Sequence, residues 1–207
     1  MDAPAPSPDA SESTEHRRRL FEGMARAVAA HGYGASTIAD IVREACVSRR
    51  TFYEHFATKA DCLIALYESA SRNALNVLRA SIDPNRGWQT QVEQATEAYL
   101  GCLANNPILI RTLFVEILGL GAPGLAARRR VNQEIANFVL TVINTRPDDP
   151  VITPDMAMAV VGGINELVLQ MIEQDRLQDL KTIAATTGVL LRAVVGLQNT
   201  AQQPQAF

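Results

Sequence analysis

The sequence predicts an all-α protein of about nine helices, in which an N-terminal three-helix unit precedes a larger helical domain. Apolar residues recur at intervals of three and four along most of the chain, which is the spacing of one face of an α-helix. No segment reads as a β-strand, and capping residues, glycines or prolines separate the periodic segments. Hydrophobic residues make up 47% of the 207 positions, which is enough for a real core.

The N-terminal part of the chain contains the signals of three short helices. Residues 1–14 combine prolines, serines and acids without periodicity, which predicts a disordered tail. An apolar stripe in residues 16–31 then ends at Gly32, and its members are Leu20, Met24, Ala27 and Val28. Ser36 and Thr37 can cap a second helix, and Ser48 can cap a third at residues 49–56. We therefore place an N-terminal domain at residues 15–60.

The rest of the chain predicts six longer helices and a second domain. Thr58 can cap a helix at residues 59–81. The glycines at 119–124 and the prolines at 147–154 are interpreted as linkers, and Thr153 and Pro154 begin a further helix. The remaining helices are predicted at residues 88–104, 107–118, 125–144, 154–175 and 179–197. The second domain is placed at residues 61–200, with a frayed end at 201–207.

Charge is distributed unevenly along the chain. The formal net charge is −3, but residues 16–60 contain eight lysines and arginines against four acids. A local excess of positive charge in an acidic protein is typical of a module that approaches phosphates.

The cysteines and the hydropathy pattern indicate the cellular compartment. Cys46, Cys62 and Cys102 are odd in number and lack CxxC spacing, so they predict neither a disulfide framework nor a zinc site. We expect no secretory signal, and the most apolar run, at residues 156–172, is interrupted by glycines, an asparagine and a glutamate. We interpret that run as a doubly buried helix and expect a soluble cytoplasmic protein with no metal, cofactor or membrane partner.

The third predicted helix has the composition of a DNA-recognition helix. Phe52 and Phe56 lie four residues apart and can face inward, which turns the polar side chains outward. Arg49 and Arg50 at its start suit bidentate contacts with guanine or phosphate. A helix-turn-helix inserts such a helix into the major groove while the preceding helix braces it. The run at residues 17–19 contains three arginines, which could contact phosphate or simply be solvated.

These segments resemble the TetR family of regulators over residues 17–66. The similarity is carried by residues 37–42 (TIADIV), 47–56 (VSRRTFYEHF) and 59–63 (KADCL), and by a first helix that ends in HGY. The resemblance implies phosphate contacts from Thr37, Tyr53, His55 and Lys59. It implies base contacts from Ser48, Arg49, Arg50 and Thr51.

Two residues depart from the family pattern. Cys46 stands at the turn where the family usually has glycine, and a left-handed conformation there would cost about 1 kcal/mol, so an adjusted turn is expected. Cys46 could act as a redox switch or as a structural turn residue, and the sequence leaves both interpretations open. Arg50 stands where the family often has glycine, so the base preference of relatives does not transfer.

The resemblance further implies that the last two helices pair with those of a second subunit. Gly162 and Gly163 each cost about 1 kcal/mol in a helix interior, which close approach of another backbone would explain. The predicted dimer contacts are Val160, Gly162, Gly163, Leu167, Ile183, Leu190, Leu191 and Val194. The middle helices would enclose an effector pocket, although an aromatic residue or methionine at helical spacing is more often core than pocket lining. The predicted lining is Trp88, Tyr99, Cys102, Phe114, Ile117, Phe138 and Met171.

The sequence thus predicts a ligand-responsive regulator that is not an enzyme. It would be a repressor that binds a near-palindromic double-stranded DNA operator as a homodimer and is released by a small apolar molecule. An activator with the same scaffold is an alternative that the sequence leaves open. An enzyme is a second class, but HExxH, GxSxG and a glycine-rich phosphate loop do not occur. A third is a ligand-carrying or architectural dimer with an inactive N-terminal domain, which lacks salt-dependent DNA binding.

Overall fold

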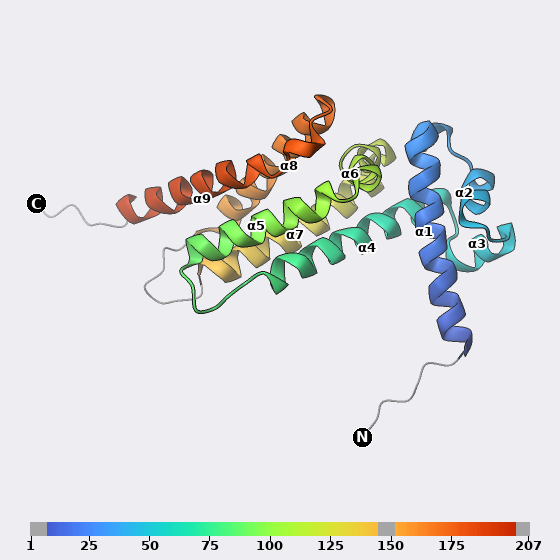
Figure 1. Ribbon diagram of the computed structural model, residues 1–207, viewed down its shortest axis with the longest axis horizontal. Helices are drawn as coiled ribbons and strands as arrows, with labels where there is room; N and C mark the ends of the chain where they lie inside the picture. The colour runs from blue at the N-terminus through green and yellow to red at the C-terminus, as the bar shows by residue number, and fades with distance from the viewer. Residues whose placement is uncertain (1–7, 145–151, 202–207) are drawn as a thin grey trace, which may run out of the picture.

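The computed structural model describes residues 8–144 and 152–201, and its elements are helices that form a small head and an elongated bundle (Figure 1). The head comprises α1 to α3 and the first turns of α4, and the bundle comprises α4 to α9. The predicted all-α class is confirmed. The bounds are α1 Pro8–Ala35, α2 Ile38–Ala45, α3 Arg49–His55, α4 Lys59–Ala80, α5 Trp88–Ala104, α6 Pro107–Phe114, the 3-10 helix η1 Glu116–Leu120, α7 Ala122–Ile143, α8 Pro154–Glu173, η2 Leu177–Asp179 and α9 Thr182–Ala201.

Helix α1 begins earlier than predicted. Pro8 suits a first helical turn because it has no N–H that needs a partner. Arg18 forms ion pairs with Glu15 and Glu22, which lie three and four residues away along the helix. The tail predicted over residues 1–14 is therefore wrong from residue 8 onward, and residues 1–7 lie outside the described part. Residues 11–15 are exposed and carry no apolar stripe, so periodicity could not reveal this part of α1.

The core of the head extends into α4. Leu20, Met24, Ile41 and Phe52 pack with α4 residues such as Leu63, and all five are fully buried. The domain boundary predicted at residue 60 is therefore too early. Gly23 sets the crossing of α1 and α2, because a Cβ there would lie 2.5 Å from the carbonyl oxygen of Ile41.

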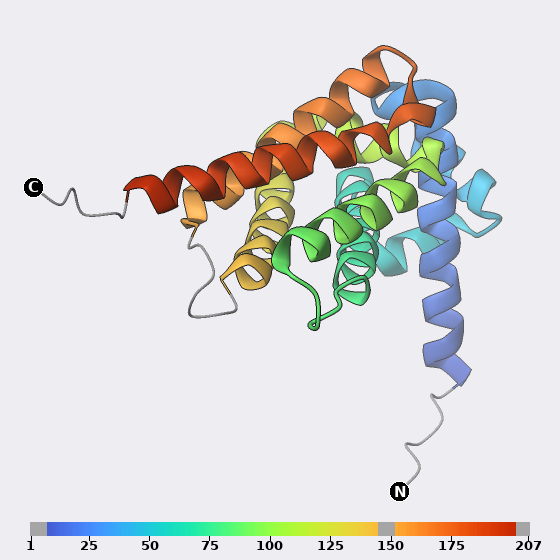
Figure 2. The ribbon, with the colours of Figure 1, turned by 60° about the vertical axis from the view of Figure 1, so that its left-hand side comes forward.

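The bundle packs its later helices around α4, α5 and α7. Helix α8 packs against α7 and α9, and α9 packs against α5. Figure 2 shows α9 along the outside of the bundle, with its C-terminal end far from the head. The large buried side chains of the bundle include Leu100, Ile117, Ile143, Leu180 and Leu191.

The segment at residues 107–124 differs from the prediction. The helix expected at 107–118 divides into α6 and η1, and α7 begins at Ala122 rather than at Leu125. Gly124 was interpreted as part of a linker, but it is buried in the first turn of α7. A Cβ at Gly124 would lie 2.0 Å from the carbonyl oxygen of Ile117, so this glycine permits close packing. Most of the linker predicted at 147–154 lies outside the described residues.

Helix α8 is apolar and long enough to cross a membrane. Its mean hydropathy over 18 residues is 1.3, and 33% of that window is buried inside the fold. Counting the bent pair Trp88–Ala104 and Pro107–Leu120 as one span raises the number of such candidates to two. The run at residues 156–172, which the sequence analysis interpreted as a doubly buried helix, lies within α8. A buried core helix satisfies the same criterion.

Candidate functional site

The turn between α2 and α3 is set by local capping and by one strained residue. Thr37 and Asp40 form a reciprocal capping box at the start of α2, and the Thr37 hydroxyl is the main cause that lowers the pKa of Asp40 to about 2. Cys46 ends α2 in the left-handed conformation, with φ 51° and ψ 46°. Arg19 donates a hydrogen bond to the carbonyl oxygen of Cys46. The expected adjustment of this turn was therefore wrong.

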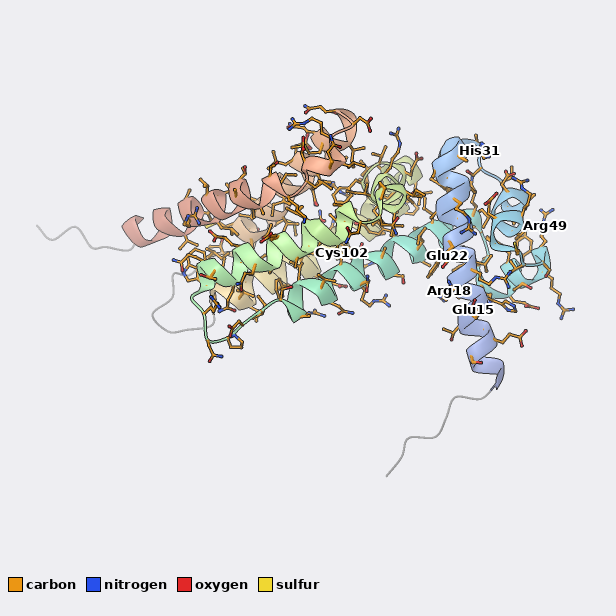
Figure 3. The ribbon with its side chains drawn as sticks, in the orientation of Figure 1. Glu15, Arg18, Glu22, His31, Arg49 and Cys102 are labelled. Carbon is orange, nitrogen blue, oxygen red and sulfur yellow. The ribbon has the colours of Figure 1, made fainter. Side chains whose placement is uncertain are left out.

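One face of helix α3 is buried in the head, and the opposite face is exposed. The Ser48 hydroxyl accepts a hydrogen bond from the backbone N–H of Thr51 at 2.9 Å and so caps the helix. Phe52 and Phe56 are buried in the core of the head, whereas Arg49, Arg50 and Tyr53 are exposed. Figure 3 shows Arg49 on the side of the head that faces away from the bundle.

Ion pairs neutralise part of the positive charge on the head. The four acidic residues between positions 16 and 60 each form an ion pair with an arginine, in the pairs Glu22–Arg18, Asp40–Arg43, Glu44–Arg26 and Glu54–Arg50. Among the described residues, neither Arg17 nor Arg49 has an ion-pair partner. The Arg17 guanidinium instead stacks over the rings of Phe21 and Phe56, and that of Arg49 over Tyr53.

Arg50 is available despite its ion pair. Its side chain is 89% exposed, and its Nε lies 3.0 Å from the Glu54 carboxylate. An exposed ion pair of this kind contributes little to the stability of the fold, so a phosphate or a base edge can displace Glu54 from Arg50.

Two further predicted DNA contacts have structural roles in the head. The ring of His55 meets that of His16 edge-on at 6.4 Å, and burial, then His16 and Arg17, lower the pKa of His55. The Lys59 ammonium donates hydrogen bonds to the carbonyl oxygens of Tyr33 and Ser36, both at 2.7 Å. The DNA contacts assigned to the eight candidate residues stay predictions.

The head is joined to the bundle at a break inside α1, where Gly32 adopts φ 74°. Glu116 in η1 accepts a hydrogen bond from the backbone N–H of Tyr33 at 3.0 Å, while Lys59 holds the Tyr33 carbonyl. Leu109 and Leu120 of the bundle also pack against the core of the head. The sequence analysis missed this junction, because nothing local signals a contact between residues 83 positions apart.

An apolar cavity lies inside the bundle between α4, α5, α7, α8 and α9. We call it the inner cavity, and its volume is about 50 Å³. Tyr99 and Phe138, both predicted lining residues, contribute to its wall. The sequence analysis missed its polar residues, which are Thr96, Asn165 and Thr187.

The other predicted pocket residues lie elsewhere. Trp88 and Phe138 line an open cleft of about 530 Å³ beside the inner cavity, which we call the outer cleft. Phe114 and Tyr99 line a second cavity of about 30 Å³. Cys102 lies on a surface groove with Lys181 (Figure 3). Ile117 is fully buried and Met171 packs against the same core, and neither of them nor Cys102 is among the residues that line the inner cavity.

The predicted dimer contacts divide into inward and outward residues. Val160, Ile183 and Leu191 are at most 2% exposed and pack into the core of their own protomer. They were misassigned because α8 and α9 carry apolar residues around much of their circumference. Gly162 is exposed, and a Cβ there would have no neighbour within 4 Å. The remaining predicted contacts, which are partly exposed, are Gly163, Leu167, Leu190 and Val194.

The head matches a known family of proteins. Residues 21–66 match the model described as "Bacterial regulatory proteins, tetR family". A segment of 77 residues is 31% identical to the uncharacterized HTH-type transcriptional regulator YxbF of Bacillus subtilis (strain 168). That segment is 37% of this chain, and it spans only 20% of the length of YxbF.

Solved structures share the whole fold. The fatty acid degradation regulator FadR from Bacillus halodurans superposes with a TM-score of 0.74 at 16% identity, over 84% of this chain and 96% of that chain. The transcriptional regulator FadR from Bacillus subtilis, solved in complex with stearoyl-CoA, gives a TM-score of 0.73 at 16% identity, over 86% and 98%. At these identities the similarity shows the fold.

Proposed function

Because the chain is a transcriptional regulator of the TetR family, we propose that it is a repressor that binds a near-palindromic operator as a dimer and is released by a small, mainly apolar molecule. The observation that carries this proposal is the geometry of α3. Two buried phenylalanines hold the helix, while Arg49, Arg50 and Tyr53 are exposed.

The proposed contacts fall into two groups. Arg49 and Arg50 stand at the N-terminal end of α3, where their forked guanidinium groups can pair with guanine edges in the major groove. Ser48 and Thr51 lie beside them and would complete the base contacts. Thr37, Tyr53, His55 and Lys59 would bind phosphates and fix the register, as backbone contacts usually do.

A dimer through α8 and α9 would bring two heads to one operator. The two recognition helices would then reach major-groove faces about 34–36 Å apart, or a multiple of that spacing, on a site with matching symmetry. Val189 on α9 is 59% exposed, which adds apolar area to this face. Gly162 has no neighbour in its own protomer that requires a glycine, so close approach of a partner backbone offers a reason for it.

Ligand release is supported by the position and size of the inner cavity. Ligand pockets usually measure about 300–1,000 Å³, so a ligand must widen a cavity of about 50 Å³ by moving the helices around it. Helix α4 lines the cavity with Leu78 and holds the head through Lys59 at its other end. Movement of α4 would therefore alter the placement of the heads, with a coupling of about 1–3 kcal/mol. The Bacillus subtilis FadR was solved with stearoyl-CoA, whose acyl chain is apolar, which agrees with an effector that has an apolar part.

The first experiment is selection of genomic DNA fragments by the purified protein at low and moderate salt. We expect enrichment of one near-palindromic sequence and a steep loss of affinity with salt, because phosphate contacts release counterions. The paired substitutions Arg49→Ala and Arg50→Ala should weaken operator binding by at least about tenfold. A matched control combines Arg72→Ala with Arg129→Ala, which removes the same charge from exposed positions on α4 and α7. Equal operator affinity of all three proteins would contradict the proposal.

The dimer is tested separately by its molecular mass in solution. Gly162→Leu should yield a folded monomer, because the added side chain would block approach of the partner. Gly101→Leu is the control, since a Cβ there meets only the end of the Lys181 side chain at 4.0 Å. A dimer that persists in Gly162→Leu with unchanged affinity would exclude this face. We place the protein in the cytoplasm, where it would meet its DNA.

A further inference from the structure

The lining of the inner cavity suits an uncharged group of a ligand. Among the residues that the structure describes, its lining contains no lysine, arginine, histidine, aspartate or glutamate. Aliphatic side chains and the rings of Tyr99 and Phe138 form most of the wall. An ionised group placed there would lose its hydration without gaining a partner, so the part of a ligand that enters the cavity must be neutral.

One polar group in the cavity is without a partner. The Thr187 hydroxyl belongs to a residue that is 1% exposed, and within the described part of the chain it makes no hydrogen bond. Other hydroxyls in these helices donate to the carbonyl four residues earlier, as Thr112 does to Ile108 and Ser81 does to Val77. Most buried polar atoms in proteins are bonded, so an unpaired one needs an explanation.

The other two polar residues of the cavity differ from Thr187. Asn165 already donates to the side chain of Asn132 at 3.1 Å, and neither the Thr96 hydroxyl nor that of Tyr99 is among the fully buried, unpaired side-chain atoms of the described residues. Asn165 also borders the second cavity, together with Tyr99 and Ile135. The polar side of the inner cavity therefore offers Thr187 as the group that still needs a hydrogen-bond partner.

The surroundings indicate how a ligand would enter and extend. Phe138 and Val142 line both the inner cavity and the outer cleft, so they form the wall between them. The Phe138 side chain is partly buried, and its rotation would join the two spaces. The outer cleft has polar and charged residues at its rim, including Arg79, Gln91 and Glu134. The neutral end of a ligand would thus lie innermost.

Resting on the proposed function, we propose that the effector inserts an uncharged, largely apolar end into the inner cavity, where its carbonyl or hydroxyl oxygen forms a hydrogen bond with the Thr187 hydroxyl. Thr187 lies on α9, one of the two helices proposed to form the dimer. Binding there would connect ligand recognition to the relative placement of the subunits.

The test uses short probes that differ only at their polar end, titrated calorimetrically into the full-length protein. The probes are n-heptane, methyl n-pentyl ketone, n-heptanol and heptanoate. We expect the ketone and the alcohol to bind about tenfold more tightly than the alkane, which corresponds to one buried hydrogen bond, and the carboxylate to bind most weakly. Thr187→Val should reduce the preference for the oxygen to less than about twofold, and Thr187→Ser should keep it.

A second measurement guards against a merely structural effect. Thr187→Val should unfold at a temperature no lower than the wild type, because it removes an unpaired hydroxyl at nearly constant shape. Thr112→Val is the matched control, since that buried hydroxyl is bonded and lies outside the inner cavity. It should keep the preference of the wild type for the ketone.

The outcomes separate this inference from the proposed function. Absence of ketone binding, or a ketone preference that survives Thr187→Val, would overturn the assignment of Thr187 even if the protein enriches an operator. A lower unfolding temperature in Thr187→Val would also overturn it, because the hydroxyl would then be satisfied by a trapped water. A preserved ketone preference without operator enrichment would support the ligand site and contradict the repressor.

Discussion

At the scale of single residues, the head combines strong local signals with one conformation that its residue disfavours. Capping residues at Thr37, Ser48 and Thr58 fix where three helices begin. Cys46 ends α2 at φ 51°, which a residue with a Cβ adopts at a cost. Burial of Phe52 and Phe56 and the hydrogen bond from Arg19 to the Cys46 carbonyl hold this turn in place.

The strain at Cys46 leads to a stability prediction. Cys46→Gly should raise the free energy of unfolding by about 1 kcal/mol, because glycine adopts the left-handed conformation without steric cost. Cys46→Ala is the control, since it removes the sulfur but keeps the Cβ, and it should resemble the wild type. Urea denaturation of the three proteins measures the difference. Equal stabilisation by alanine and glycine would locate the effect in the thiol rather than in the backbone.

His55 leads to a prediction about pH. Burial first, and then His16 and Arg17, lower the pKa of His55 in the folded protein, whereas an unfolded chain has a histidine pKa of about 6.5. The unfolded state therefore binds more protons, so this group makes the protein less stable as the pH falls through about 6.5. His55→Gln should flatten the loss of stability between about pH 7 and pH 5.5, measured by urea denaturation.

The control for His55 is His31→Gln, which changes an exposed histidine at the end of α1. This variant should keep the pH dependence of the wild type. A His55→Gln protein that loses stability as steeply as the wild type on acidification would assign the effect to other groups.

At the scale of elements, the sequence predicted helices well where an apolar stripe and a cap coincide. The start of α3 at Arg49 and of α8 at Pro154 agree with their caps, Ser48 and Thr153. The prediction failed where a residue type has two meanings. Prolines and acids suggested a tail at residues that form the start of α1, and glycines at 119–124 suggested a linker. Only the packing of η1 against α7 distinguishes a glycine needed for close contact from one in a linker.

Gly124 tests that distinction. In an isolated helix, alanine would be favoured over glycine by about 1 kcal/mol. In this fold, Gly124→Ala should instead lower the free energy of unfolding by about 2 kcal/mol, because the new Cβ would collide with the Ile117 carbonyl. Gly119→Ala is the control, since its Cβ would have no neighbour within 4 Å, and it should change stability by less than about 0.5 kcal/mol. Denaturant unfolding that ranks the two variants equally would refute the packing role.

At the scale of the whole molecule, the candidate recognition residues could be predicted from the sequence, but the cavity and the junction could not. The recognition residues lie within one short segment whose spacing defines its faces. The inner cavity draws on five helices, so the type of residue alone could not separate Tyr99, which lines it, from Ile117, which is core. The junction depends on Glu116, whose partner Tyr33 lies 83 positions away.

The junction at Tyr33 carries the final prediction, which concerns communication between bundle and head. Glu116 of η1 accepts a hydrogen bond from the Tyr33 N–H, and Lys59 at the start of α4 donates one to the Tyr33 carbonyl, so the bundle and the first turn of α4 both contact this break in α1. Glu116→Ala should accelerate amide hydrogen exchange in residues 36–58 by about tenfold, the effect of losing one charge-assisted hydrogen bond, and leave α8 unchanged. Glu116→Gln keeps an acceptor and should exchange like the wild type. Uniform acceleration across head and bundle would mean that Glu116 supports global stability, whereas acceleration confined to the head would identify it as the link between the proposed DNA-binding surface and the proposed ligand-binding core.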